Sequence, residues 1–183
     1  MVANTLGFEE IHEAFRSKIH RYLVRLVGEG EAEDLTQEVF VKVSRALKTF
    51  RGESQLSTWI YRIATNAALD RMRTSSFRQE ARELLFDEAD EVESQDLWTG
   101  EEPLSIEQQL LRIERNECFM EFVQNLPTHY RTIVVLSELE ELTNLEIAEI
   151  LGLSLNVVKI RLHRGRTRLL GELKAHCKAE DWL

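Results

Sequence analysis

The sequence predicts an all-α protein built from two small helical domains that are joined by an acidic linker. Apolar residues recur three or four positions apart in the first third of the chain and again near its end, which is the spacing of one helix face. The 183 residues include only 8 Gly and 2 Pro, and the alternation typical of strands is hard to find. Between the two helical parts, residues 79–107 carry eleven acidic residues and one basic residue.

The first helix is predicted by an apolar stripe that runs from Phe8 to Leu26 at helical spacing, and Gly28 and Gly30 end it. A second helix, over about residues 31–50, places its apolar residues on one face. Its opposite face is polar and carries Asp34, Gln37, Glu38, Lys42 and Arg45.

A short polar loop at residues 51–55 separates the second helix from a third, which is predicted over about residues 57–73. The side chains of the third helix that should face the core are Trp59, Ile60, Ile63, Ala64 and Ala67. Three helices of this length can close a small bundle.

The acidic stretch at residues 87–103 has no sustained apolar period, and repulsion between its like charges should keep it extended. We therefore predict a linker over residues 77–104, between domains at residues 6–76 and 105–175. Composition alone leaves open whether this linker is only a solubilising spacer.

The second domain is predicted to be a series of helices whose ends carry recognisable signals. Ser105 and Thr143 each begin a capping-box pattern, and Pro127 stops the helix before it. The predicted helices span about residues 105–125, 128–139, 143–151 and 155–175.

The last two of these helices form the pattern of a helix-turn-helix. Such a unit needs a small residue where the helices cross, a turn residue that tolerates positive φ, and an apolar residue that docks the second helix. Ala148, Gly152 and Val158 stand at these places. Although the net charge of the chain is −9, residues 154–178 carry seven basic residues and one acidic residue. A basic helix alone could be only a solvated face, but this turn chemistry favours DNA binding.

Several functional classes lack support in the sequence. Cys118 and Cys177 lie far apart and outside any C-x-x-C pattern, so neither a disulfide framework nor a zinc site is expected. We find no secretory signal and no stretch long enough to span a membrane, which predicts a cytoplasmic protein without membrane insertion. No P-loop, G-x-S-x-G, H-E-x-x-H or dinucleotide-binding motif is present. We therefore expect a protein that is not an enzyme and that uses no cofactor and no metal.

The order and spacing of several segments resemble the extracytoplasmic-function sigma factors of the sigma-70 family. In the first domain these segments are EDLTQEVF at residues 33–40, FRGES at residues 50–54 and STWIYRIATN at residues 57–66. In the second domain they are LP at residues 126–127, IAEILG at residues 147–152 and VVKIRLHRGR at residues 157–166.

The resemblance implies a protein that gives RNA polymerase its promoter specificity. Residues 6–76 would be sigma domain 2, which binds core RNA polymerase and recognises and melts the −10 element. Residues 105–175 would be sigma domain 4, whose helix-turn-helix reads the −35 element. The acidic linker at residues 77–104 would thread the basic channels of the polymerase. The implied partners are core RNA polymerase, promoter DNA and an anti-sigma factor.

The resemblance also assigns roles to individual positions. The residues that would grip core polymerase are Asp34, Gln37 and Glu38. The residues that would contact the −10 element are Arg51, Ser54, Gln55, Tyr61, Arg62, Asn66, Arg71 and Arg73. The residues that would contact the −35 element are Lys159, Arg161, His163, Arg164 and Arg166.

Two positions of the last helix depart from the family pattern. Ile160 stands where the family often has a small polar residue, and an apolar side chain there would favour a thymine methyl group. Gly165 stands where the family often has Ala, and it should soften the helix by up to about 1 kcal/mol.

The alternative to a sigma factor is a stand-alone helix-turn-helix transcription regulator. Such a regulator would bind duplex promoter DNA without polymerase. It would leave the N-terminal bundle unexplained, because that bundle shows no receiver-domain or small-molecule-pocket pattern.

Overall fold

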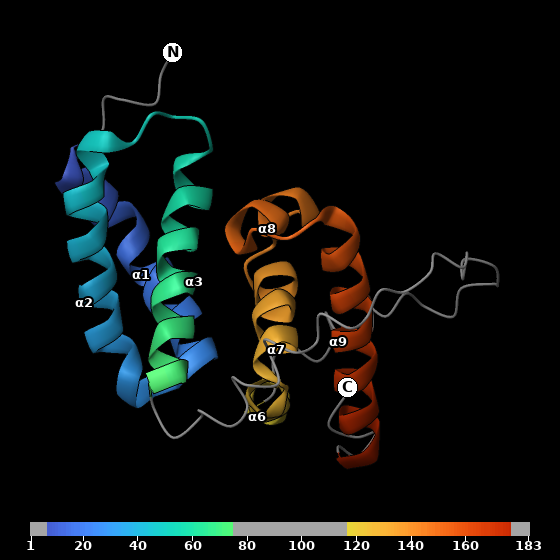
Figure 1. Ribbon diagram of the computed structural model, residues 1–183. Coiled ribbons are helices and arrows are strands. Elements are labelled where there is room, and N and C mark those ends of the chain that lie inside the picture. Colours follow the sequence, from blue (N-terminus) through green and yellow to red (C-terminus); the bar gives the residue numbers. More distant parts are fainter. Residues whose placement is uncertain (1–6, 75–116, 177–183) are drawn as a thin grey trace.

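The computed structural model describes residues 7–74 and 117–176, and every regular element in these two ranges is helical (Figure 1). This confirms the predicted all-α fold with two helical domains. The predicted linker at residues 77–104 and the capping box that begins at Ser105 lie outside the described residues.

The N-terminal bundle packs three long helices around one apolar core (Figure 1). Its elements are α1 (Phe8–Val27), α2 (Glu29–Ala46), the short 3-10 helix η1 (Leu47–Thr49) and α3 (Leu56–Thr74). The apolar stripes predicted from helical spacing do meet in the core, where Ile19, Leu35 and Ile60 are fully buried. Tyr22 joins them and shares a hydrogen bond of 2.7 Å with Thr65, which satisfies its buried hydroxyl.

The C-terminal unit contains a chain of shorter helices that ends in one long helix. Its elements are α6 (Glu117–Asn125), α7 (Thr128–Val134), the π-helical segment η4 (Val135–Leu139), α8 (Asn144–Leu151) and α9 (Leu155–His176). The predicted capping box at the start of α8 is formed, because the Thr143 amide donates to Glu146 at 2.8 Å and the Glu146 amide donates to Thr143 at 3.3 Å.

The turn between α8 and α9 has the geometry that a helix-turn-helix requires. Gly152 adopts φ 65° and ψ 32°, the left-handed conformation that costs glycine little. Val158 is fully buried and docks α9 against the unit, while Ser154 accepts a hydrogen bond from the Val157 amide at the start of α9.

Gly165 allows α7 and α9 to approach each other closely. It is buried, and a Cβ atom at this position would lie 2.9 Å from Cγ2 of Val134 and 3.4 Å from Cβ of Tyr130. Val134 is fully buried and β-branched, so it cannot rotate away at low cost. The expectation that Gly165 only softens the helix was therefore incomplete, because this glycine is also a packing residue.

The two domains pack against each other through α3 and α8, and α1 contacts α6 and η4 (Figure 1). Arg131 of α7 donates to the Leu26 carbonyl of α1 at 2.8 Å. Arg25 of α1 bridges Glu140, which directly follows η4, at 2.7 Å. We call this seam the domain contact; sequence patterns gave no sign of it.

We expect Gly165→Ala to lower the free energy of unfolding by about 1–2 kcal/mol. The clash with Val134 costs about 1–3 kcal/mol, and the better helix propensity of Ala returns about 1 kcal/mol of this. Gly171→Ala is the matched control on the same helix, since nothing lies within 4 Å of its added Cβ. It should raise stability by up to about 1 kcal/mol. Chemical denaturation of both variants measures the difference, and equal effects would contradict the packing role.

Candidate functional site

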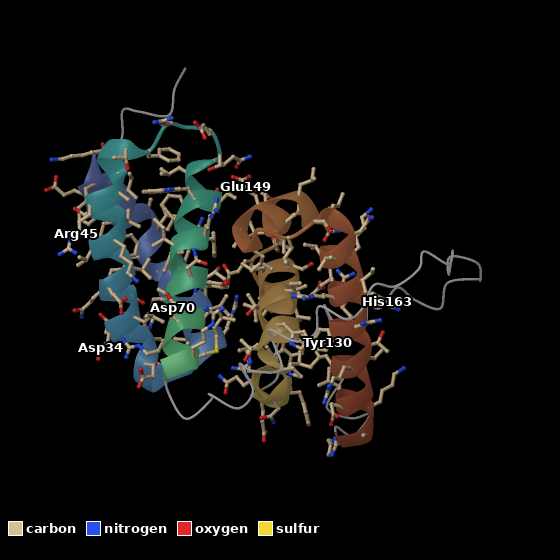
Figure 2. The ribbon with its side chains drawn as sticks, in the orientation of Figure 1. Asp34, Arg45, Asp70, Tyr130, Glu149 and His163 are labelled. Atoms are coloured by element: carbon tan, nitrogen blue, oxygen red, sulfur yellow. The ribbon has the colours of Figure 1, made fainter. Side chains whose placement is uncertain are left out.

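The surface of α2 presents the three residues that were expected to bind a protein partner. Asp34, Gln37 and Glu38 are all exposed on the side opposite the buried stripe of this helix. Figure 2 shows Asp34 on the outer side of the bundle, away from the C-terminal unit. Lys42 pairs with Glu38 at 2.8 Å, and this hydrogen bond lowers the pKa of the Glu38 carboxyl. The α2 surface is therefore a charged patch that stays open to solvent.

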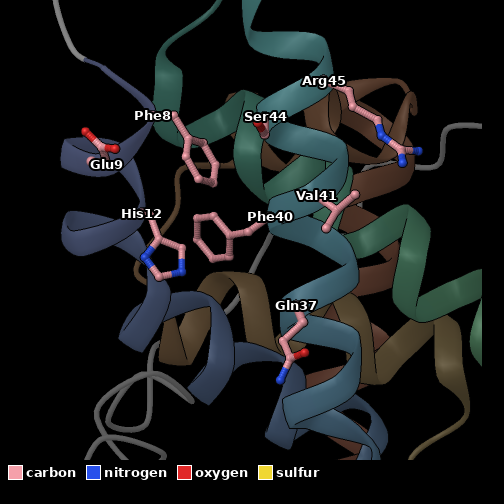
Figure 3. Close-up of a pocket in the computed structure, with 8 residues that line it drawn as sticks. All are labelled: Phe8, Glu9, His12, Gln37, Phe40, Val41, Ser44 and Arg45. Carbon is pink, nitrogen blue, oxygen red and sulfur yellow. The ribbon is translucent and has the colours of Figure 1, made fainter.

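An apolar groove of about 510 Å³ lies beside this surface, between α1 and α2 (Figure 3). Phe8 and Phe40 form its floor together with His12, whose ring packs edge-on against Phe40 at 4.8 Å. Val41 is 48% exposed at the wall of the groove, and Gln37 lies at one end. The sequence gives no sign of the groove, because its aromatic residues fit the pattern of ordinary core positions.

A second cavity, of about 440 Å³, brings together the loop after η1 and the start of α3. Arg51, Ser54 and Arg62, which were predicted to contact nucleic acid, all line it. Phe50 and Trp59 form an aromatic wall, with ring centroids 4.8 Å apart. Trp59 is half-buried, so it faces this cavity as well as the core. We call this the loop–α3 cavity.

One wall of the loop–α3 cavity comes from the other domain. Glu149 of α8 lines it together with the two arginines and Glu53, and Figure 2 shows Glu149 on the side of α8 that is turned toward α3. The cavity therefore combines cationic and aromatic groups suited to single-stranded nucleic acid with two carboxylates that would repel it. No sequence signal pointed to Glu149, because it lies nearly a hundred positions away.

The other residues expected to contact the −10 element are spread along α3. Gln55 and Asn66 are exposed, and Asn66 follows Arg62 by one helical turn.

Arg71 bridges α3 to α2 through Glu31 at 2.8 Å and Glu38 at 3.5 Å. Arg73 is exposed and lies 3.6 Å from Asp70. Of the residues predicted to contact the −10 element, only Arg51, Ser54 and Arg62 line the cavity, and the others lie elsewhere along α3 or in the loop.

Tyr61, which the family resemblance implied as a contact to the −10 element, is buried in the domain contact in this structure. Its hydroxyl donates to Glu140 of the C-terminal unit, and its ring packs edge-on against Tyr22 at 5.2 Å. Burial raises the pKa of the Tyr61 hydroxyl, and the neighbouring Glu140 carboxylate adds to the rise. Helical spacing alone could not separate the face of α3 that meets α8 from the face that meets solvent.

The long helix α9 carries the predicted −35 residues on more than one face. Lys159 and His163 are exposed one turn apart, and Figure 2 shows His163 on the side away from the N-terminal bundle. Arg161 and Arg164 are half-buried beside them. Ile160 is 41% exposed on the same outer face, where an apolar side chain of this size is unusual.

Arg166, which was also predicted to contact the −35 element, forms an ion pair with Glu138 of η4 in this structure. It is half-buried and donates to Glu138 at 2.6 Å, and the side chain of Glu138 is only 9% exposed. A carboxylate this deeply buried requires a cationic partner. Arg166 therefore holds α9 to the segment η4.

In the described parts of the chain, no group of three or more His, Cys, Asp or Glu side chains is placed to hold a metal ion. Among the described helices, none combines the length and the apolar character that crossing a membrane would require.

The comparisons with known proteins agree with this geometry. The family models for sigma-70 region 2 and sigma-70 region 4 match residues 11–78 and 116–169. The ECF RNA polymerase sigma factor SigW of Bacillus subtilis is 34% identical over 171 residues, which cover 92% of this chain and 89% of that protein. The ECF RNA polymerase sigma-E factor of Haemophilus influenzae is 30% identical over 169 residues, which cover 92% and 88%.

Two solved structures share the fold. The sigma factor RpoE in complex with the anti-sigma factor NepR from Bartonella quintana matches with a TM-score of 0.65 and 21% identity, covering 92% of this chain and 98% of that one. CnrH in complex with the cytosolic domain of CnrY matches with a TM-score of 0.62 and 23% identity, covering 92% and 88%.

We expect Arg166→Met to lower the free energy of unfolding by about 3 kcal/mol, because it leaves the Glu138 carboxylate buried without its partner. Arg168→Met removes an exposed charge from the same helix and should change stability by less than about 0.5 kcal/mol. Thermal or chemical denaturation measures both. If the two variants were equally stable, Arg166 would not have the structural role assigned here.

Proposed function

This chain belongs to the extracytoplasmic-function sigma factors of the sigma-70 family, and on that basis we propose how its surfaces direct RNA polymerase to promoters. The protein binds core RNA polymerase and starts transcription at promoters that carry matching −10 and −35 elements. The observation that carries this proposal is the order of two family regions, each of which presents polar or basic residues on an outer surface. The protein acts by binding and positioning, in the cytoplasm where the polymerase works, and it performs no chemistry of its own.

Residues 6–76 form the domain that binds core polymerase. Asp34, Gln37 and Glu38 supply charged and polar contacts, and the apolar groove beside them supplies area that loses water on docking. Charged residues at the rim of an interface mainly give specificity and speed of association, whereas burial of the groove would give affinity. The outer face of α2 carries few apolar side chains, so the groove would supply most of the apolar area that is buried when core polymerase binds.

The loop–α3 cavity is the proposed −10 reader. Arg51 and Arg62 would meet backbone phosphates of the melted strand, and Phe50 with Trp59 would offer a stacking surface for an unstacked base. Ser54 and Gln55 add polar groups beside the cavity. Asn66, one turn further along α3, carries both a donor and an acceptor and can therefore read a base edge. Arg73 lies farther along the same helix and would contact the backbone.

The start of α9 is the proposed −35 reader within residues 105–175. Lys159 and His163 lie on its outer face, and Arg161 and Arg164 flank them. Entry of this end into a major groove would bring the four side chains to base edges and phosphates. Ile160 between them would favour a thymine methyl group.

Two further features complete the proposal. The linker at residues 77–104 belongs to the strongly acidic part of the sequence, which suits it to the basic, nucleic-acid-carrying channels of the polymerase. The two structural relatives were solved in complex with other proteins, an anti-sigma factor in the case of RpoE. An anti-sigma factor is accordingly the proposed regulator of this chain.

Run-off transcription with bacterial core RNA polymerase over a library of promoter fragments tests this function. We expect discrete transcripts that require the protein and that share −35 and −10 elements. An absence of protein-dependent transcripts, together with sequence-specific binding of duplex DNA by the protein alone, would instead support a stand-alone regulator.

The −35 assignment predicts a difference between two parts of α9. Lys159→Ala or His163→Ala should lower transcription from a −35-dependent promoter by about tenfold, because each removes a contact to a base or phosphate. Lys174→Ala removes an exposed charge near the other end of the helix and should leave transcription unchanged. Binding of each variant to core polymerase, measured separately, should equal that of the wild type. Equal losses in all three variants would show that only overall charge matters.

A further inference from the structure

We propose that Ile160 reads the C5-methyl group of a pyrimidine in the −35 element, so that methylation of a cytosine at that position strengthens the promoter. This inference rests on the −35 reader proposed for the start of α9. It adds a chemical group that the reader recognises, and with it a way in which a modification of promoter DNA regulates this protein.

Ile160 lies at the centre of the outward face of α9. Val158 and Leu162, two positions before and two positions after it, are both buried against the rest of the C-terminal unit. Two residues correspond to slightly more than half a helical turn, so the side chain between them points away from the unit. Ile160 is 41% exposed, and it is the side chain that would reach deepest into a groove approached by this face.

The neighbours of Ile160 on the outward face are polar. Asn156, His163 and Thr167 are exposed and follow one another at helical spacing with Ile160 in the same stripe. Figure 2 shows that this side of the helix, marked by His163, is turned away from the N-terminal bundle. Lys159 is exposed beside the stripe and gives it positive charge. One apolar side chain therefore stands among polar groups that can meet base edges and phosphates.

The position of this isoleucine carries the argument, since single apolar side chains are common on protein surfaces. In the major groove the edges of unmodified bases present hydrogen-bonding groups and one apolar group, the C5-methyl of thymine. A cytosine methylated at C5 presents the same methyl group at the same carbon. Contact between Ile160 and either methyl removes apolar surface from water on both sides.

The same side chain disfavours a base that lacks the methyl group. Ile160 can neither donate nor accept a hydrogen bond. A polar base edge pressed against it would lose water without gaining a partner. Ile160 therefore discriminates in both directions, by the contact that it makes and by the hydrogen bonds that it cannot make.

The contact is also prepared before DNA arrives. A β-branched side chain in a helix has one strongly preferred χ1 rotamer, so Ile160 loses little rotational freedom on binding. The buried Val158 and Leu162 fix the start of α9 against the unit, and this sets the direction in which Ile160 projects. The reader is thus rigid at the point where it would meet the methyl group.

Run-off transcription with core RNA polymerase and the full chain tests the inference, on a promoter selected from the library described above. Each pyrimidine of its −35 element is prepared in four forms on synthetic templates: thymine, uracil, cytosine and 5-methylcytosine. The ratio of transcripts with and without the methyl group is measured at limiting holoenzyme.

Three variants accompany the wild type in this assay. Ile160→Ser removes the apolar surface with little change in helix propensity, and Ile160→Val retains a branched apolar side chain. Leu145→Ser is the matched control, because Leu145 is 68% exposed but lies on α8. Binding of each variant to core polymerase, measured separately, should equal that of the wild type.

We expect one −35 position at which the wild type gives about fourfold more transcript with the methyl group than without it, on both pyrimidines, because burial of one methyl group contributes about this factor. The ratio should fall close to one in Ile160→Ser. It should stay near the wild-type value in Ile160→Val and in Leu145→Ser.

Transcription that responds to the methyl group at no position would overturn the inference and leave the proposed function standing. A ratio that persists in Ile160→Ser, or that falls equally in Leu145→Ser, would overturn the assignment to Ile160. A wild type that gives no transcript from the unmodified promoter would overturn the proposed function and this inference together.

Discussion

Burial of the Glu140 carboxylate determines how the two halves of this protein are arranged. A charge that loses water needs partners with good geometry, and those available here are Arg25 of α1 and Tyr61 of α3. Satisfying it fixes η4 against the N-terminal bundle and brings α8 over the start of α3. The hydrogen bond from Arg131 to the last turn of α1 adds a second point of attachment, where the helix dipole favours a cation. These polar contacts and the packing of α3 on α8 together hold the C-terminal unit against the N-terminal bundle.

The arginines of this chain divide into two groups that composition cannot distinguish. Arg25, Arg71 and Arg166 each bridge a carboxylate of another element, and so hold the fold together. Arg51 and Arg62 line the loop–α3 cavity together with the carboxylates of Glu53 and Glu149. Guanidinium groups suit both tasks, because their planar set of donors pairs equally well with carboxylates and with phosphates. A helix rich in basic residues therefore offers fewer contacts to DNA than its charge suggests.

Members of this family share their architecture at modest identity, and in this chain the packing of α7 on α9 depends on one glycine. The relatives are about one-third identical, and the structural relatives less than one-quarter. The close approach of the two helices here depends on the missing side chain of Gly165 against Val134. A residue with a low helix propensity is thus required by the neighbouring helix. Local propensity and tertiary packing make opposite demands, and packing prevails.

The sequence by itself determined the helices, the two domains, the capping box at Thr143, the turn at Gly152 and the family, because each depends on residues close together in the chain. It also predicted contact residues that include Asp34, Arg62, Lys159 and His163, and these side chains are exposed in the structure. Only the tertiary structure decided that Tyr61 and Arg166 point inward, that Gly165 is a packing residue and that Glu149 reaches the loop–α3 cavity. Helical periodicity shows which residues share a face, but it cannot show which second helix will cover that face. That choice is made by long-range burial, in which distant side chains must satisfy each other's charge and volume.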